Sequence, residues 1–363
     1  METECTVIQG YADDSIYNCW QLYRNISAPF LQLLSEKIDD SIVRTFLLCY
    51  NEEKNFRRCV MSVTMTERRI PSTDGIHELY TRVYTPDGEI KAIFHVVHGM
   101  TEHIGRYDGF LDAMAQKGYL TFAFDNLGHG NTAKDDAELG FIAHEDGYKY
   151  MAEDVYASAQ IIKKEYGEDL PYYLMGHSMG SFIVRYATQL HPDLPDKLII
   201  MGTGGPNPAT TPGIAMINII KVFKGEKAKS PFIQNMAFGA YNKGLEGPGD
   251  WLSKDPEVRK KYDADKFCNY FFSLSAYKDL LTLNKIVNID AWFKSMPKEL
   301  PILMLSGADD PVGDHGRGVK VVYDKLKQQG ANVQLKLYRN CRHEILNDDS
   351  REEVIADIAK FLG

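Results

Sequence analysis

Short apolar runs alternate with helix-like segments along the chain after about residue 70. Alternating apolar and polar residues at 77–84 and a nearly continuous apolar run at 92–97 are both typical of strands. Similar short runs predict further strands at 121–124, 172–175, 197–201, 302–305 and 333–338.

Helical patterns occupy most of the intervals between these strands. They are expected at 107–117, 181–190, 319–329 and 352–362, and in a long helix whose apolar face carries Met151, Val155, Ala159 and Ile162. Repeated strand–helix units predict an α/β fold, in which helices cover both faces of a mostly parallel sheet. We expect residues 61–205 and 300–363 to form this core.

Residues 206–299 interrupt the alternation and are expected to form a helical cap over the carboxyl ends of the strands, where open α/β sheets bind ligands. The apolar side chains of this segment either line an acyl pocket or pack the cap against the core, and both can hold at once. They are Ile214, Met216, Ile217, Ile219, Ile220, Phe271, Phe272 and Leu274.

Residues 1–60 form an extension of uncertain structure. Ser27 and Pro29 are suited to begin a helix with Leu31, Leu34 and Ile38 on one side. Two alternatives remain open. In one, this helix docks on the core or on a partner; in the other, the segment contributes little because translation begins at Met61 or Met65.

Composition and charge exclude several classes of partner. A net charge of −9 without a basic run argues against nucleic acid, and favours a neutral or amphipathic substrate. The six cysteines lack metal-binding spacing, so we predict neither metal nor disulfide. The first ten residues do not resemble a signal peptide, and no apolar run is long enough to span a membrane, which predicts a cytoplasmic protein.

The segment 176–180 reads Gly-His-Ser-Met-Gly between a predicted strand and a predicted helix. Gly176 and Gly180 permit the sharp turn that would expose the Ser178 hydroxyl, and the helix start offers N–H groups to an oxyanion. Such a motif also arises by chance, but its strand–helix context predicts a serine nucleophile at Ser178.

A serine nucleophile needs an acid and a base later in the chain. The strand at 302–305 is followed by Asp309 and Asp310, and we favour Asp310 because Pro311 restricts its backbone. Asp309 is then a turn residue. The base is predicted to be His343, after the strand at 333–338, rather than His315, which lies only five residues beyond Asp310.

The substrate oxyanion needs preorganised donors. The strand at 92–97 ends in His98, Gly99 and Met100, so we expect the backbone N–H groups of Met100 and Met179 to form the oxyanion hole. For His98, a structural role that bonds neighbouring loops is favoured over a chemical role.

Four motifs together resemble the monoglyceride lipase and lysophospholipase group of serine α/β-hydrolases, over residues 65–363. They are the segments 98–107, 125–130, 176–180 and 310–313, and the segment 250–253 resembles bacterial members. The resemblance, including the order Ser178, Asp310, His343, implies an α/β-hydrolase fold with a helical cap and this triad, with Asp310 as the acid.

The predicted activity is hydrolysis of carboxylic esters of amphipathic lipids, such as monoacylglycerol or lysophospholipid, through an acyl-enzyme on Ser178. No cofactor is predicted, and the cap is expected to make transient contact with a membrane or micelle. A short-chain carboxylesterase, a thioesterase or an acyltransferase with the same triad remains an alternative. A non-catalytic binding protein is a further alternative.

Overall fold

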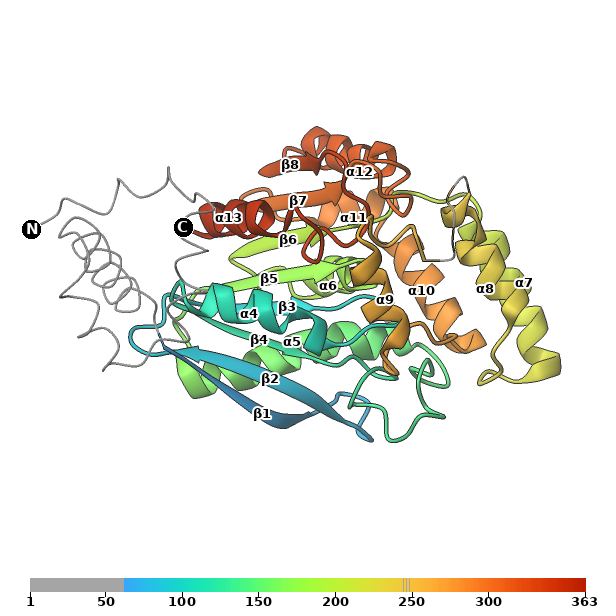
Figure 1. Cartoon of the computed structure of the whole chain (residues 1–363), viewed down its shortest axis with the longest axis horizontal. Helices are drawn as coiled ribbons and strands as arrows, with labels where there is room; N and C mark the ends of the chain where they lie inside the picture. The colour runs from blue at the N-terminus through green and yellow to red at the C-terminus, as the bar shows by residue number, and fades with distance from the viewer. Residues whose placement is uncertain (1–61, 244, 246, 248) are drawn as a thin grey trace, which may run out of the picture. The chain divides into compact units, whose positions relative to one another are not determined.

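The computed structural model describes residues 62–243, 245, 247 and 249–363, and one eight-stranded sheet organises them (Figure 1). The strand order is β1-β2-β4-β3-β5-β6-β7-β8. β2 pairs antiparallel with both β1 and β4, and the remaining pairs are parallel. The strands are β1 (Val63–Pro71), β2 (Glu78–Pro86), β3 (Ala92–Val97), β4 (Tyr119–Phe124), β5 (Tyr172–His177), β6 (Lys197–Met201), β7 (Ile302–Gly307) and β8 (Val333–Tyr338).

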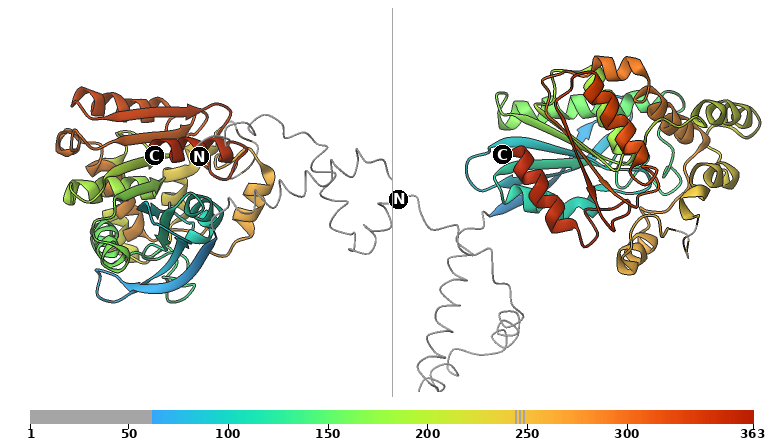
Figure 2. Two further views of the ribbon diagram at one scale, coloured as in Figure 1. Left: turned by 90° about the vertical axis from the view of Figure 1, so that its left-hand side faces the viewer. Right: turned by 90° about the horizontal axis from the view of Figure 1, so that it is seen from above.

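Helices cover both faces of the sheet, and the strand side chains divide between two cores (Figure 2). In β5, Tyr172 and Leu174 face one core, whereas Tyr173 and Met175 face the other. The first core includes residues of α5 (Gly147–Tyr166), α6 (Met179–Leu190) and α12 (Arg317–Gln328). The second includes residues of α4 (Asp108–Ala115) and α13 (Arg351–Leu362). The predicted α/β fold is confirmed.

The predicted strands all occur within a few residues of their expected positions, but one strand was not predicted. β1 pairs with β2 at the end of the sheet, and most of its residues are exposed. Such an edge strand lacks the apolar run that identifies the buried strands. The predictions for residues 1–60 lie outside the described residues.

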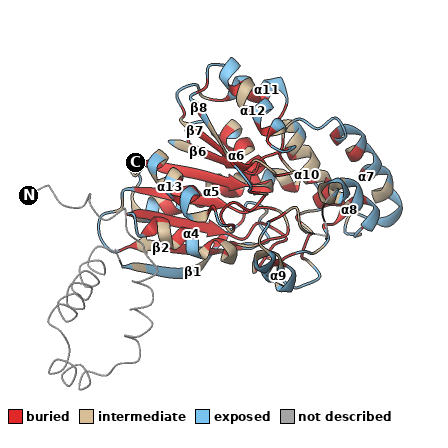
Figure 3. Cartoon of the chain, turned by 45° about the horizontal axis from the view of Figure 1, so that its top comes forward, coloured by how far each residue is buried: buried red, intermediate tan, exposed pale blue. Residues whose placement is uncertain are grey.

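The segment between β6 and β7, called here the β6–β7 insertion, contains the irregular part predicted at 206–299. Its helices are α7 (Thr210–Lys224), α8 (Pro231–Phe238), η2 (Gly239–Asn242), α9 (Pro256–Ala264), α10 (Leu274–Ile286) and α11 (Asp290–Ser295). The buried residues of α10 and α11 join the first core, so this part of the insertion is firmly packed. α7 is largely exposed, in contrast to the strands (Figure 3).

In the part of the chain that the structure describes, no helix combines the length and apolar character needed to cross a membrane.

Candidate active site

Ser178 occupies a sharp turn between β5 and α6. Its φ of 55° lies in the left-handed region, which is a strained conformation for a serine. A Cβ atom on Gly180 would lie 2.1 Å from the carbonyl oxygen of Val97, and one on Gly176 would lie 2.2 Å from that of Gly180. Both glycines are therefore required by close backbone contacts, and the turn presents Ser178 to a pocket.

Asp310 and His343 lie together at the carboxyl ends of β7 and β8. The Nδ1 atom of His343 is 2.9 Å from Oδ2 of Asp310, and both side chains are almost completely buried. Asp310 also accepts hydrogen bonds from the backbone N–H of Val312 and from the Ser306 hydroxyl. This arrangement fixes the carboxylate and orients the imidazole.

The two competing candidates lie elsewhere. Asp309 is half exposed, and its carboxylate pairs with Lys254 at 2.6 Å. The side chain of His315 is exposed, and its backbone N–H donates to the carbonyl oxygen of Asp310. The structure thus brings Asp310, and not Asp309, to His343.

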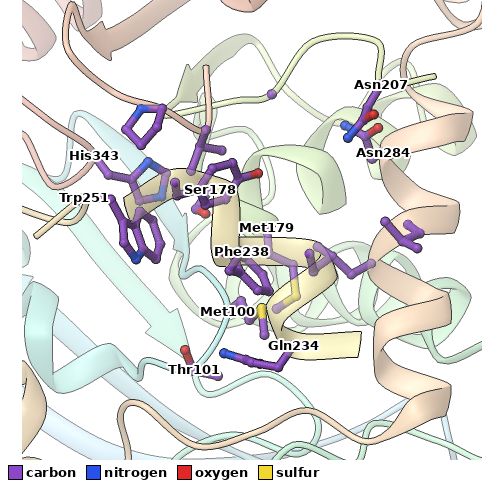
Figure 4. Close-up of a pocket in the computed structure, with 18 of the residues that line it drawn as sticks. Met100, Thr101, Ser178, Met179, Asn207, Gln234, Phe238, Trp251, Asn284 and His343 are labelled. Atoms are coloured by element: carbon purple, nitrogen blue, oxygen red, sulfur yellow. The ribbon is translucent and has the colours of Figure 1, made fainter. Parts of the chain in front are cut away.

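The second ring nitrogen of His343 is available for chemistry. Within the described residues, the buried Nε2 atom has no hydrogen-bond partner. The indole of Trp251 packs beside the imidazole, with ring centroids 5.2 Å apart, and Ser178 lies on the same pocket (Figure 4). A histidine in this position can accept a proton from a reacting group in the pocket.

Met100 and Met179 both line the pocket onto which Ser178 faces (Figure 4). Met179 is the first residue of α6, so its N–H has no partner within the helix. The loop before Met100 lies in close contact with the serine, because a Cβ atom on Gly99 would lie 3.0 Å from the Ser178 Cβ. Both predicted oxyanion donors therefore come from backbone next to the serine.

A buried charge cluster behind the site was not predicted from the sequence. The carboxylate of Glu102 accepts from the Gly99 N–H at 2.6 Å and from the Tyr107 hydroxyl at 2.9 Å. It also lies 3.3 Å from Nδ1 of His177, and its second oxygen lies 3.0 Å from the Arg106 guanidinium. The cluster links the loop of Met100 to the residue before Ser178.

The charge states within this cluster follow from its contacts. Burial alone would raise the pKa of Glu102, but the hydrogen bond from His177 and the charges of His177 and Arg106 hold it well below its usual range. Burial would conversely lower the pKa of His177, but Glu102 raises it. His177 also donates from Nε2 to the carbonyl oxygen of His343 at 3.2 Å, as expected for a doubly protonated ring.

Arg106 extends the cluster to the loop of His343. Two of its nitrogens lie 2.6 Å from the two carboxylate oxygens of Glu344, which directly follows His343. Such bidentate pairs combine strength with a defined geometry. Glu344 directly follows the predicted base His343, and Glu102 and Arg106 lie in the motif at 98–107 that contains Met100. Charged residues within these motifs were the available signal.

His98 has the structural role that the sequence favoured. It is fully buried, with Nδ1 2.8 Å from the Gly99 carbonyl oxygen, and its Nε2 accepts from the N–H of Asn126 at 2.9 Å. Burial lowers the pKa of His98, which keeps the ring neutral. Its hydrogen bonds join two adjacent loops.

The pocket has a volume of about 960 Å³ and lies between the sheet and the β6–β7 insertion. Of the two alternatives left open for the apolar residues of this segment, packing against the core holds for several of them, and none of the eight lines the pocket. Ile217, Phe272 and Leu274 are buried in the core, while Met216 and Ile219 are exposed. Other apolar side chains take their place, because the helices of the insertion turn different faces inward: Ile233, Met236, Phe238, Tyr277, Leu280 and Leu281.

Three potential metal ligands, His103, Asp265 and Cys268, lie close together outside this pocket wall. Nδ1 of His103 accepts from the Gly105 N–H, so its proton resides on Nε2, which faces Asp265 at 2.8 Å. Burial raises the pKa of the Cys268 thiol. His103 and Asp265 therefore pair with each other, and the thiol of Cys268 lies near them.

The sheet, the strained serine turn and the Asp310–His343 pair together define an α/β-hydrolase. Residues 88–350 match the family described as serine aminopeptidase, S33. The chain belongs to this family, and its relatives include proteins named monoacylglycerol lipase.

Curated relatives and solved structures agree with this assignment. A monoacylglycerol lipase of Mycolicibacterium smegmatis is 25% identical over 84% of this chain and 99% of its own length. The monoglyceride lipase of Mus musculus is 26% identical over 75% of this chain and 81% of its own. A thermostable carboxyl esterase from Bacillus coagulans, crystallised with glycerol, is 32% identical with a TM-score of 0.77, covering 82% of this chain and 98% of that chain. The resemblance noted from the motifs is confirmed.

Proposed function

We propose that this protein is a serine hydrolase that cleaves carboxylic esters of amphipathic lipids, of the monoacylglycerol or lysophospholipid type. The observation that carries the proposal is the position of Ser178 on an apolar-walled pocket beside the buried Asp310–His343 pair. The β6–β7 insertion acts as the cap of this enzyme, and residues 61–205 and 300–363 act as its core.

The reaction proceeds by acyl transfer in two steps. His343 Nε2 accepts the Ser178 proton as the Oγ atom attacks the ester carbonyl, while Asp310 holds the Nδ1–H and stabilises the imidazolium. The N–H groups of Met100 and Met179 stabilise the oxyanion. The imidazolium then protonates the leaving alcohol, and water activated by His343 releases the acid.

The substrate class follows from the pocket and the relatives. A cavity of about 960 Å³ has room for an acyl chain, and its wall carries aliphatic and aromatic side chains. Relatives named monoacylglycerol lipase and monoglyceride lipase support a lipid with a single acyl chain, and a Bacillus subtilis relative named phospholipase YtpA supports a phosphate-bearing head group as the other form of substrate.

A substrate panel tests the proposal. Monoacylglycerol and lysophospholipid of matched acyl chain should be hydrolysed with higher kcat/KM than a short p-nitrophenyl ester. Preference for the short ester, an acyl-CoA thioester or an aminoacyl amide would replace the lipid assignment with the corresponding alternative. Acyl transfer to added glycerol in preference to water would identify an acyltransferase. An inactive protein that does not react with a fluorophosphonate would point to a binding role.

The cap also offers a surface for contact with a membrane or micelle. Val222 and Phe223 at the end of α7 are 81% and 84% exposed, and Phe232 on α8 is 60% exposed. Lys221 and Lys224 lie beside them in the sequence, so anionic lipid complements this apolar surface.

Sedimentation with lipid vesicles tests this contact. Replacement of Phe223 by Ser should weaken binding to vesicles of phosphatidylcholine and phosphatidylglycerol, whereas Ile76→Ser should not, since it alters an apolar residue on the β1–β2 connection that is 68% exposed. Equal binding by wild type and both variants would refute the contact surface. We further propose a cytoplasmic location, which cell fractionation with an antibody against the chain would test.

A further inference from the structure

Helix α9 of the β6–β7 insertion holds the loop that follows β3. The Tyr262 hydroxyl donates to the carbonyl oxygen of Thr101 at 3.0 Å and lies 2.8 Å from the Thr101 hydroxyl. Because a phenol has a single proton, Thr101 Oγ1 is the donor in the second contact. Tyr262 and Thr101 are both buried, so no bulk water competes for these two hydrogen bonds.

The loop needs this support because its backbone is strained. Thr101 has a φ of 50°, a left-handed conformation that is unfavourable for a β-branched residue. Such a conformation persists only where surrounding contacts impose it. The hydrogen bonds of Tyr262 reach both the side chain and the carbonyl group of this residue.

The strained residue directly follows Met100, the proposed oxyanion donor. On the other side of Met100, the N–H of Gly99 is held by Glu102 at 2.6 Å. The peptide group that carries the Met100 N–H therefore lies between two anchored residues, one tied to the buried charge cluster and the other to α9. Within the described residues, the Met100 N–H itself donates no hydrogen bond.

We propose that Tyr262 is a positioning residue for catalysis, which aims the Met100 N–H at the substrate oxyanion by fixing Thr101. The inference rests on the proposed esterase function and deepens it, since it makes the oxyanion hole depend on the cap. α9 is then a fixed part of the site, and substrate enters without its displacement.

Two further contacts between α9 and this loop support a fixed attachment. The Arg106 guanidinium lies over the Tyr262 ring, 4.9 Å from its centroid. His103 Nε2 donates to the carboxylate of Asp265, the residue that ends α9, at 2.8 Å. Both contacts remain when only the Tyr262 hydroxyl is removed.

The test compares Tyr262→Phe with Tyr119→Phe. Tyr119 lies outside the pocket, and its hydroxyl likewise donates to a carbonyl oxygen, that of Gly363 at 2.8 Å. Three quantities are measured with monoacylglycerol: kcat, KM, and the inhibition constant of the corresponding monoalkyl ether. The ether fills the pocket but cannot form an oxyanion, so it reports on binding alone.

The proposal predicts that Tyr262→Phe lowers kcat by about 10- to 100-fold while the ether inhibition constant stays within about twofold of wild type. Tyr119→Phe should retain kcat within about threefold. Equal kcat values for the two variants, or a loss in Tyr262→Phe that appears equally in ether binding, would overturn it. Wild-type protein without hydrolysis would instead refute the proposed function.

A second variant decides the question if Tyr262→Phe does not fold. Asp265→Asn weakens the other polar tie to the same loop at a partly exposed position. A lower kcat with unchanged ether inhibition would support the proposal, and a wild-type kcat would contradict it.

Discussion

The buried cluster around Glu102 predicts a large loss of stability for Glu102→Gln. The carboxylate is 3% exposed and receives hydrogen bonds from Gly99, Tyr107, Arg106 and His177. The single amide oxygen of a glutamine cannot accept all of these hydrogen bonds, and the NH₂ group of that glutamine would face other donors. The substitution also removes the carboxylate that faces His177, while Arg106 keeps only its pair with Glu344.

The size of the effect follows from comparable buried pairs. Removing one partner of a buried ion pair costs about 3 to 5 kcal/mol, because the remaining charge is buried without compensation. For a domain of this size we expect Tm to fall by about 6 to 10 °C. The loss should become smaller only below about pH 4.5, the ordinary pKa of this carboxyl, because there the unfolded wild-type chain binds a proton that folded Glu102 does not.

Thermal unfolding followed by circular dichroism at pH 7 measures this shift. Glu67→Gln is the matched control, since Glu67 is 47% exposed and pairs with Arg82 at 3.1 Å. An exposed pair contributes about 0 to 1 kcal/mol, so the control should unfold within about 2 °C of wild type. A Tm for Glu102→Gln as high as that of the control would refute the reasoning.

Two further predictions concern a titrating carboxyl and the serine turn. Burial raises the pKa of Asp279 to about 7, and its Oδ2 atom has no partner among the described residues. The folded protein therefore favours the protonated carboxyl, and this contribution to the free energy of unfolding is lost as pH rises from about 4 through 7. Asp279→Asn should therefore be more stable than wild type at pH 8, by up to roughly 4 kcal/mol, with little difference at pH 4; equal urea midpoints at pH 8 would contradict this. Gly180→Ala would place a Cβ atom 2.1 Å from the Val97 carbonyl oxygen, so it should lower fluorophosphonate labelling at least 100-fold. Labelling at the wild-type rate would show that the turn tolerates a side chain.

Local patterns identified the sheet because its central strands are buried on both faces. β3, β4 and β5 are entirely buried, and each appears in the sequence as a short apolar run. β1 carries mostly polar, exposed residues, so its strand character depends on pairing with β2, which a local pattern does not contain.

The sequence identified the site residues whose role follows from their residue type and from their position after a strand. Ser178, Asp310 and His343 each follow a strand, and the parallel sheet brings these ends together. The contacts that support them depend on tertiary packing between distant segments, as in the pair of Arg106 and Glu344, 238 residues apart. The sequence also did not predict which face of each cap helix packs on the core and which lines the pocket. Both surroundings require apolar residues, so the hydrophobic pattern does not distinguish them.

Hydrolysis of monoacylglycerol by wild type beside Ser178→Ala tests the catalytic role of Ser178 most directly. We predict that kcat falls by a factor on the order of 10⁴ to 10⁶ in the variant, with unchanged Tm and with loss of fluorophosphonate labelling. Turnover in Ser178→Ala within tenfold of wild type would contradict the assignment of Ser178 as the nucleophile.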